Sequence, residues 1–204
     1  YMKKLNTYLY DHLKNLPHDL FNLILSYSKN NNIRTAFVGG FIRDLLIQKI
    51  HNMSNYKSID LDILTEGSPI LLAKFIKKSI RNVELCLIKE FDIYKTVEVN
   101  IDGIKIDIAS AREEVYSAPG ENPLVKDSTI EKDLKRRDFT INSIAFEPLG
   151  KQIIDLYEGI THINSKELHL LHSNSVIDDP SRILRCAKYA SRLGFDISKT
   201  ALYQ

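Results

Sequence analysis

Two short segments of the chain alternate aspartates with branched apolar residues. Residues 58–65 read SIDLDILT, and residues 104–111 read IKIDIASA. Because successive side chains of a β-strand point to opposite faces, Asp60 and Asp62 share one face, and Asp107 lies on the polar face of the second segment. The alternation predicts two half-buried strands of one sheet, with their isoleucines and leucines facing the core.

The rest of the chain mixes helix and strand patterns. Apolar residues at helical spacing predict helices over residues 5–30 (divided at Pro17), 41–48 and 68–80. Strands are expected within residues 35–40, 83–90, 94–102 and 151–157, with a hairpin turn at Asp102-Gly103. We further expect a polar loop over residues 113–133, a helix over 134–146, and helices without strands over 159–204. These elements predict an α+β fold, with a mixed sheet and flanking helices in residues 1–158 and a helical extension in residues 159–204.

The composition fits one large domain, or a domain and a half, in 204 residues. Hydrophobic residues make up 44% of the chain, which is enough for a sizeable core, and the net charge of +2 does not by itself indicate nucleic-acid binding. The two cysteines, Cys86 and Cys186, have no metal-ligand spacing, and no apolar run reaches the roughly 18 residues of a membrane span. Without a signal-peptide pattern, we expect a soluble, cytoplasmic protein with no membrane partner, although an organelle protein without its presequence would look the same.

Three carboxylates on neighbouring strands suit a site for divalent metal ions. Like charges side by side repel each other, and a cation relieves that cost. Two Mg²⁺ ions about 4 Å apart serve in-line nucleotidyl transfer, where one activates the attacking hydroxyl and the other holds the triphosphate. By itself, however, an Asp-x-Asp pair is also typical of a solvent-facing edge strand.

The glycine pair Gly39-Gly40 lies between an apolar run and a helix. Glycines at a helix N-terminus let phosphate approach the backbone N–H groups, and Arg43 in the first turn would add positive charge. An ordinary tight turn is the alternative interpretation of these residues.

Five sequence blocks occur together in one order. They read FVGGFIRDLL, DLDILTEG, KIDIASAREEVY, DLKRRDFTINSIAF and DDPSRILRCAKYASRLGF. In order and spacing, the blocks resemble the class II tRNA nucleotidyltransferase and bacterial poly(A) polymerase family over residues 20–197. The resemblance implies a polymerase-beta-like nucleotidyltransferase head followed by a helical neck, and body and tail domains that grip tRNA. That family adds C, C and A to tRNA 3′ ends without a nucleic-acid template, or A alone in the poly(A) branch.

The resemblance implies a catalytic and metal-binding role for three aspartates. Asp60 and Asp62 match the metal-binding Asp-x-Asp of the family, and Asp107 falls where its third strand carboxylate is expected. Asp107 would help to deprotonate the RNA 3′-hydroxyl, and the three residues together would hold two Mg²⁺ ions.

The resemblance also implies nucleotide binding by three blocks, through Gly39, Gly40, Arg43, Arg137, Asp138, Asn142, Asp179, Arg182 and Arg185. Asp138 and Asn142 are spaced i, i+4 on the expected helix, so they would share a face for the ribose and triphosphate, and Arg137 would supply charge to the phosphates. Asp179 and Arg182 match an amino-acid template that pairs with C or A through hydrogen bonds.

Each of these blocks also has a structural alternative. A Lys-Arg-Arg run is typical of a solvated face, and the Asp-Asp-Pro segment that ends at Pro180 is a strong helix start. Asp44 could orient Arg43 or serve as a helix-start charge. Arg185 is expected to contact phosphate or RNA rather than read the base.

The expected activity is metal-dependent, template-independent transfer of CMP and AMP from CTP and ATP to the 3′ end of tRNA. A poly(A) polymerase, or an enzyme that adds only CC or only A, fits the same blocks, and a catalytically silent nucleotide- or RNA-binding module is a further alternative. Residues 113–133 lie where the family keeps a flexible element for the switch from C to A, and Asp178 stands where the family often has Glu. Because the chain ends near residue 204, we expect the tRNA-gripping domains to be missing and tRNA binding to be weak or absent.

Overall fold

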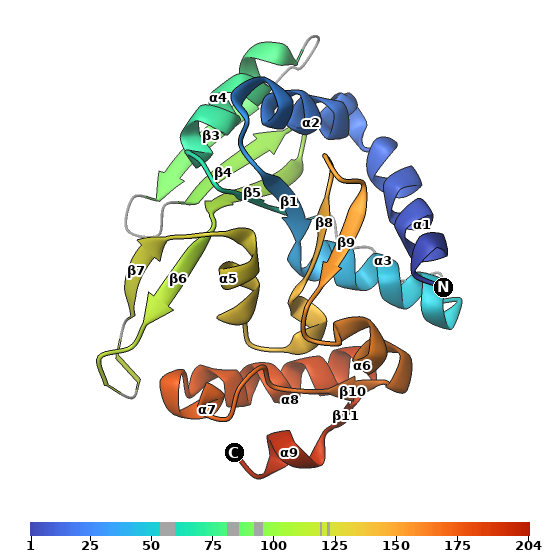
Figure 1. The fold of residues 1–204 in the computed structure, drawn as a ribbon, viewed down its shortest axis with the longest axis vertical. Coiled ribbons are helices and arrows are strands. Elements are labelled where there is room, and N and C mark those ends of the chain that lie inside the picture. The colour runs from blue at the N-terminus through green and yellow to red at the C-terminus, as the bar shows by residue number, and fades with distance from the viewer. Residues whose placement is uncertain (54–59, 81–85, 92–95, 119, 122) are drawn as a thin grey trace.

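The chain is built around a mixed sheet with strand order β3-β4-β5-β2-β1-β8-β9 (Figure 1). The computed structural model describes residues 1–53, 60–80, 86–91 (backbone only), 96–118, 120–121 and 123–204. The strands of this sheet are β1 (Thr35–Val38), β2 (Leu61–Thr65), β3 (Cys86–Phe91), β4 (Thr96–Ile101), β5 (Ile104–Ser110), β8 (Ile144–Glu147) and β9 (Gln152–Asp155). Residues 83–85 and 94–95 of the expected strands lie outside the described residues.

Strands β2 and β5 are parallel neighbours near the middle of the sheet, and their register places Asp62 beside Asp107. The other described pairs of this sheet are antiparallel. The hairpin between β4 and β5 turns at Asp102-Gly103, as predicted. A mixed sheet with flanking helices confirms the predicted α+β class.

Helices α1 to α4 pack on one face of the sheet and enclose the main core. They are α1 (Met2–Lys14), α2 (Leu20–Asn31), α3 (Gly39–His51) and α4 (Pro69–Ser79). In α1, the buried residues Leu5, Leu9 and Leu13 follow the four-residue spacing of one helix face. The 3₁₀ helix η1 (Pro17–Asp19) separates α1 from α2, so the division predicted at Pro17 is confirmed.

The opposite face of the sheet carries Asp62 and is covered by the short helix α5 (Ile130–Lys135). Ile130 and Leu134 of α5 pack in one apolar cluster with Val38, the residue that pairs with Asp62 across β1 and β2. This smaller cluster leaves part of the face open for polar side chains, while the main core lies behind it.

The expected loop over residues 113–133 was wrong. It contains most of an antiparallel hairpin, β6 (Arg112–Val115) with β7 (Leu124–Asp127), followed by the start of α5. Val115 is 58% exposed and Leu124 is 68% exposed. Main-chain hydrogen bonds therefore define these strands. Because neither strand buries one face, the sequence shows no alternating apolar pattern that would predict them.

The expected helix over residues 134–146 was also wrong. Helix α5 ends at Lys135, the 3₁₀ helix η3 (Thr140–Asn142) follows, and β8 takes up the final residues. The N–H of Thr140 bonds the carbonyl of His169, far along the chain, instead of a carbonyl one turn back. Strand β8 is buried on both faces, and a short continuous apolar run of this kind cannot be distinguished from a buried helix by its period.

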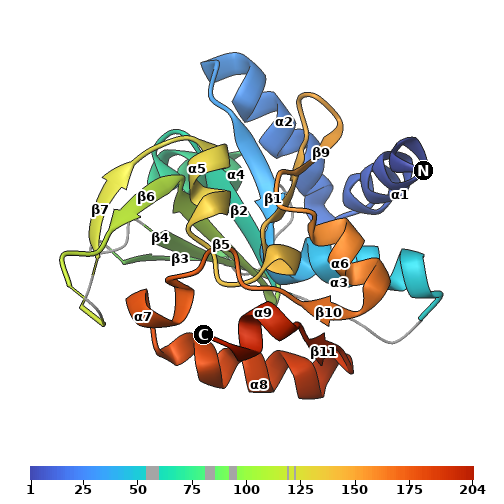
Figure 2. The same cartoon turned by 60° about the horizontal axis from the view of Figure 1, so that its bottom comes forward.

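The C-terminal part is mainly helical, as predicted, and lies below the end of the sheet (Figure 2). Its helices are α6 (Gly159–Ser165), α7 (Ser175–Asp178), α8 (Ser181–Leu193) and α9 (Lys199–Leu202). The expectation of no strand here was wrong, because β10 (Glu167–Leu168) pairs in parallel with β11 (Asp196–Ile197). Two residues are too few to leave a period in the sequence. No helix within the described ranges is long and apolar enough to cross a membrane.

Candidate active site

A cavity of about 440 Å³ brings together residues from all five sequence blocks. Its walls come from the turn between β1 and α3, the polar face of β2, the β6–β7 hairpin, the η3 region and α8. Of the predicted residues, it is lined by Asp62, Gly39, Gly40, Arg137, Asp138, Asn142, Asp179, Arg182 and Arg185. Tyr116, Tyr189 and Pro123 add flat apolar surface to the same cavity.

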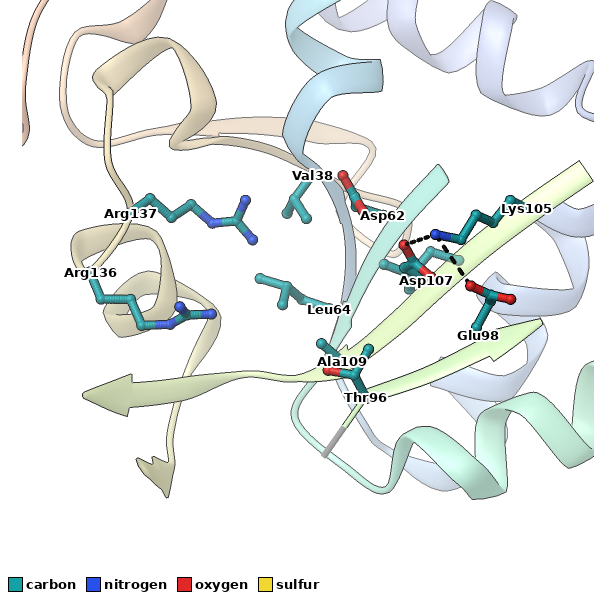
Figure 3. Close-up of a pocket in the computed structure, with 11 residues that line it drawn as sticks. Val38, Asp62, Leu64, Thr96, Glu98, Lys105, Asp107, Ala109, Arg136 and Arg137 are labelled. Atoms are coloured by element: carbon teal, nitrogen blue, oxygen red, sulfur yellow. Dashed lines mark ion pairs between the residues drawn. The ribbon is translucent and has the colours of Figure 1, made fainter. Parts of the chain in front are cut away.

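A neighbouring cavity of about 420 Å³ lies over β2, β4 and β5 (Figure 3). Asp62, Arg136 and Arg137 line both cavities, and Asp107 lines this one. Figure 3 shows Arg137 extending toward Asp62 from the opposite wall. The predicted phosphate-binding arginine and the predicted metal-binding aspartate therefore face the same space.

Asp62 is the central carboxylate of the two cavities. Burial raises its pKa, the positive charge of Arg137 lowers it, and the negative charges of Asp107 and Asp60 raise it further. The backbone N–H of Gly40 donates a hydrogen bond to the Asp62 carboxylate, which favours the charged form. The net shift is upward, so the site disfavours the negative charge on Asp62 and would be relieved by a cation.

Gly39 allows the β1–α3 turn to approach Asp62 closely. Its φ is +71°, and a Cβ atom on Gly39 would lie 2.3 Å from Oδ2 of Asp62. Only glycine combines this backbone conformation with that space. The turn therefore contacts the aspartate in this structure, which adds a second reason for glycine beside the expected contact with phosphate.

Asp107 is paired with Lys105, two residues earlier on the same strand. The Nζ atom of Lys105 lies 3.2 Å from Oδ2 of Asp107 and 3.3 Å from Oε2 of Glu98 on β4. These are partly exposed contacts, so they hold the side chains only weakly. Lys105 supplies positive charge next to the carboxylates while leaving Asp107 within reach of solvent.

The donor set fits Mg²⁺ in part. Asp62 and Asp107 are hard oxygen ligands on adjacent strands, and the raised pKa of Asp62 reflects charge that a cation would neutralise. Asp60 lies just before β2 and is exposed. Within the described ranges, no three His, Cys, Asp or Glu side chains are gathered closely enough to hold a metal ion.

Asp133, a residue that the sequence analysis did not single out, organises the arginine pair. It is completely buried on α5 and accepts hydrogen bonds from Nε and Nη2 of Arg136, at 3.0 and 2.7 Å, and from Nε of Arg137, at 3.2 Å. Glu114 on the hairpin accepts a further bond of 2.9 Å from Arg136. The spacing of an acid three and four residues before two arginines was the available signal.

Arg43 lies behind the cavity and positions Asn142. Its side chain is 2% exposed, and it donates to Oδ1 of Asp44 at 2.7 Å and to Oδ1 of Asn142 at 2.6 Å. Asn142 in turn donates to Oδ1 of Asp138 at 3.0 Å. Asp138 and Asn142 meet as expected, although through a turn and η3 and not along a helix.

The residues expected to read the base lie at the start of α8: Asp179 lies just before this start, and Arg182 is in the first turn. Oδ1 of Asp179 accepts from the N–H and hydroxyl of Ser181, so the helix-start interpretation is confirmed. Oδ2 of Asp179 lies 2.8 Å from Nη2 of Arg185 and 3.6 Å from Nε of Arg182. Arg185 also lies 3.6 Å from Asp138, which links this helix to the η3 region.

Residues 35–169 match the family described as the poly A polymerase head domain. The chain belongs to this family. The predicted membership in the class II tRNA nucleotidyltransferase and poly(A) polymerase family is thereby confirmed. The match covers most of the sheet, the arginine block and the start of the C-terminal helices.

The similar proteins are also tRNA nucleotidyltransferases and CCA-adding enzymes. An A-adding tRNA nucleotidyltransferase from Geobacter sulfurreducens is 37% identical over 79% of this chain and 18% of its own length. The solved structure of a CCA-adding enzyme in an apo form is 32% identical and covers 95% of this chain and 45% of its own, with a TM-score of 0.80. A tRNA nucleotidyltransferase solved with a primer tRNA and an incoming ATP analog is 30% identical, covering 88% and 48%, with a TM-score of 0.73. The chain therefore spans less than half of each of these proteins.

Proposed function

We propose that this chain carries the catalytic head of an enzyme that transfers CMP and AMP from CTP and ATP to the 3′ end of tRNA. One observation carries the proposal: the acidic, glycine, arginine and α8 blocks line a single cavity of about 440 Å³. A cavity of this size is suited to a nucleotide, with a flat apolar wall at Tyr116 and Tyr189 and charged groups at the other walls.

In this proposal, the polar face of the sheet holds the reacting end of the nucleotide. Arg137 binds the triphosphate beside the Gly39-Gly40 turn, whose Gly40 N–H holds the Asp62 carboxylate, and Asp138 with Asn142 orients the ribose. Arg43 acts from behind by fixing Asn142. Asp107, close to solvent, accepts the proton of the RNA 3′-hydroxyl.

Asp62 and Asp107, which lie side by side on β2 and β5, are the residues that would hold two Mg²⁺ ions, and Asp60, exposed just before β2, is the predicted third ligand. When bound, such ions neutralise the triphosphate and stabilise the charge that develops in the transfer. The observation that supports this assignment is the register of β2 and β5, which places Asp62 beside Asp107, in a setting where burial and the neighbouring carboxylates raise the pKa of Asp62.

A second candidate, the addition of A alone, is favoured by the 37% identity to an A-adding enzyme. The two candidates share the phosphate and metal residues, and they differ in what Asp179 and Arg182 accept as the incoming base. Addition of CC alone and poly(A) synthesis would use the same residues. The cytoplasmic location and the division into a head (1–158) and the start of a neck (159–204) stay predictions.

The test uses the full-length protein with ATP, CTP, Mg²⁺ and tRNAs that end before the CCA, after the first C, or after both Cs. Sequencing of the product ends is expected to show C, C and A on the first tRNA. Extension of only the tRNA that ends in CC would support the A-adding candidate. No extension of any of the three tRNAs would refute the proposed function.

A further inference from the structure

Arg182 separates two cavities. It lines the candidate active site and also a cavity of about 400 Å³ that contains His172 and Asp178. Its side chain is 4% exposed, so the guanidinium group is held between the two spaces and cannot move out into solvent without rearrangement.

The guanidinium group of Arg182 is held from the side away from Asp179. Nη1 donates a short hydrogen bond to Oγ of Ser175, which is completely buried, and lies 3.4 Å from Nε2 of His172. Nη2 donates to the backbone carbonyl of Arg136 at 3.0 Å. A guanidinium group has five N–H donors in a rigid plane, so these three contacts fix its orientation.

The opposite edge of the guanidinium group has an unmet donor. Nε of Arg182 is buried and has no hydrogen-bond partner among the described residues, and it lies 3.6 Å from Oδ2 of Asp179. A buried N–H without an acceptor costs free energy, so a hydrogen-bond acceptor placed next to Nε would be stabilised. Asp179 supplies an acceptor next to it, and both residues line the candidate active site.

The protonation state of His172 allows its ring to accept a hydrogen bond from Arg182. Burial is the largest cause that lowers the pKa of His172, followed by the positive charge of Arg182. The negative charge of Asp178 raises this pKa, and the positive charge of Lys135 lowers it. The neutral ring can therefore accept at Nε2. Oδ2 of Asp178 lies 3.9 Å from Nδ1, which favours the tautomer with its proton on Nδ1.

The groups that hold Arg182 from behind are uncharged. A serine hydroxyl, a neutral imidazole and a carbonyl fix the plane of the guanidinium group without neutralising it. The positive charge therefore stays available at the edge that faces the active-site cavity.

We propose that Ser175 and His172 are positioning residues for base selection, because they fix Arg182 so that its Nε edge and Asp179 face the incoming base. The inference rests on the proposed function and adds two residues to it. Neither residue lines the active-site cavity, so they act through Arg182 and not by contact with the nucleotide.

The test compares nucleotide preference in the full-length protein. For each triphosphate, kcat/KM is measured on the tRNA end that the wild-type protein extends. Ser175→Ala is expected to reduce the preference for the correct base over UTP and GTP by about tenfold, the effect of one lost buried contact. Affinity for inorganic triphosphate, measured by calorimetry, is expected to stay unchanged, because the phosphate-binding residues are intact.

The matched control is Ser28→Ala, which removes another buried serine hydroxyl, bonded to Thr35 in the contact between α2 and β1. It should keep the wild-type preference. A second pair of variants covers the case in which Ser175→Ala does not fold. His172 has a side chain that is 36% exposed, so it tolerates substitution. His172→Gln, which keeps a neutral acceptor, should retain more of the preference than His172→Ala.

Wild-type base preference in Ser175→Ala, or in His172→Ala where the serine variant is unfolded, would overturn the inference and leave the proposed function standing. An equal loss of preference in His172→Gln and His172→Ala would also count against it, because the acceptor would then have no role. If the wild-type protein transfers no nucleotide, the proposed function fails, and the inference fails with it.

Discussion

At the scale of single residues, the candidate site depends on neighbours that leave space for its charged side chains or that pair with them. Gly39 leaves room for the Asp62 carboxylate, and Asp133 holds the two arginines that face it. Gly39 contacts a segment that is distant in the sequence, whereas Asp133 holds arginines that are three and four residues further along the chain. Each can be tested by one substitution.

Gly39→Ala is expected to lower nucleotide transfer by at least about 100-fold, because a displacement of roughly 1 Å at a reacting group has effects of this size. The added Cβ would lie 2.3 Å from Oδ2 of Asp62 and would push the carboxylate away. Gly103→Ala is the control, because Gly103 also has a positive φ, of +87°, but an added Cβ there has no atom within 4 Å. Equal loss of transfer in both variants would show that backbone strain, and not the contact with Asp62, is responsible.

Asp133→Asn is expected to lower the free energy of unfolding by about 3 kcal/mol, since it removes the buried carboxylate that pairs with both Arg136 and Arg137. The KM for the triphosphate should rise in the same variant, because Arg136 and Arg137 lose their common acceptor. Urea unfolding and steady-state kinetics measure the two effects. Asp11→Asn, at an exposed position on α1, should change neither quantity. An unchanged KM in Asp133→Asn would refute the positioning role.

Sequence reasoning predicted residues that the fold brings to one cavity, but it missed side chains that hold them in place. Asp62, Asp138 and Asn142 come from short blocks whose residue types are dictated by chemistry, so a single sequence can reveal them. Asp133 and Ser175 are both completely buried, and their importance depends on which arginine the fold brings to them. The spacing of Asp133 before Arg136 and Arg137 was a local signal, but no local pattern points from Ser175 to Arg182.

At the scale of secondary structure elements, Arg34 ties several elements together at the edge of the sheet. Its guanidinium group lies within 2.8 to 3.1 Å of Glu66 after β2, Glu131 on α5 and Glu147 on β8. The hydrogen bond from Arg34 lowers the pKa of Glu131 to about 2 from its ordinary value of 4.5. The cluster therefore fastens α5, which begins the arginine block, to the sheet.

Glu131→Gln is expected to lower the free energy of unfolding at pH 7 by only about 0.5 kcal/mol, because solvent screens an ion pair that is more than a third exposed. The folded-state pKa is depressed, so the contribution of the pair is present above about pH 4.5 and is lost as the pH falls toward 2. Unfolding measured between pH 7 and pH 2.5 should show the difference between wild type and variant shrinking in that window. If the difference in free energy of unfolding between wild type and variant stays constant with pH, the ion pair is not its cause. Glu121→Gln, at an exposed position, serves as the control.

The elements themselves were predictable where one face is buried. Helix α1 and strands β4 and β5 have such faces, and their periods appear in the sequence. The β6–β7 hairpin has no buried face, and β8 is buried on both, so neither leaves a readable period. Tertiary contacts decide the structure of these segments.

At the scale of the whole molecule, the candidate active site lies between the sheet and the C-terminal helices. The sheet side contributes Asp62 and the glycine turn, and the C-terminal side contributes Asp179, just before α8, and Arg182 in α8. The site therefore includes residues from both sides of the predicted boundary at residue 158. A change in how α8 lies against the sheet would alter the distance between Arg182, the proposed base-reading residue, and Arg137, the proposed phosphate-binding residue. Under the proposed function, nucleotide choice would then depend on the position of this helix.

The central claim is that the carboxylate face of this sheet transfers nucleotides, and the most direct measurement is nucleotide incorporation by the full-length Asp62→Asn variant. With Mg²⁺, ATP, CTP and tRNA that lacks its 3′ end, the rate is expected to fall by at least about 1,000-fold relative to wild type. Because the pKa of Asp62 is raised, the neutral asparagine should leave the stability of the metal-free fold unchanged or slightly higher. The variant Asp11→Asn should behave as wild type. Wild-type rates of incorporation by a folded Asp62→Asn protein would contradict the claim.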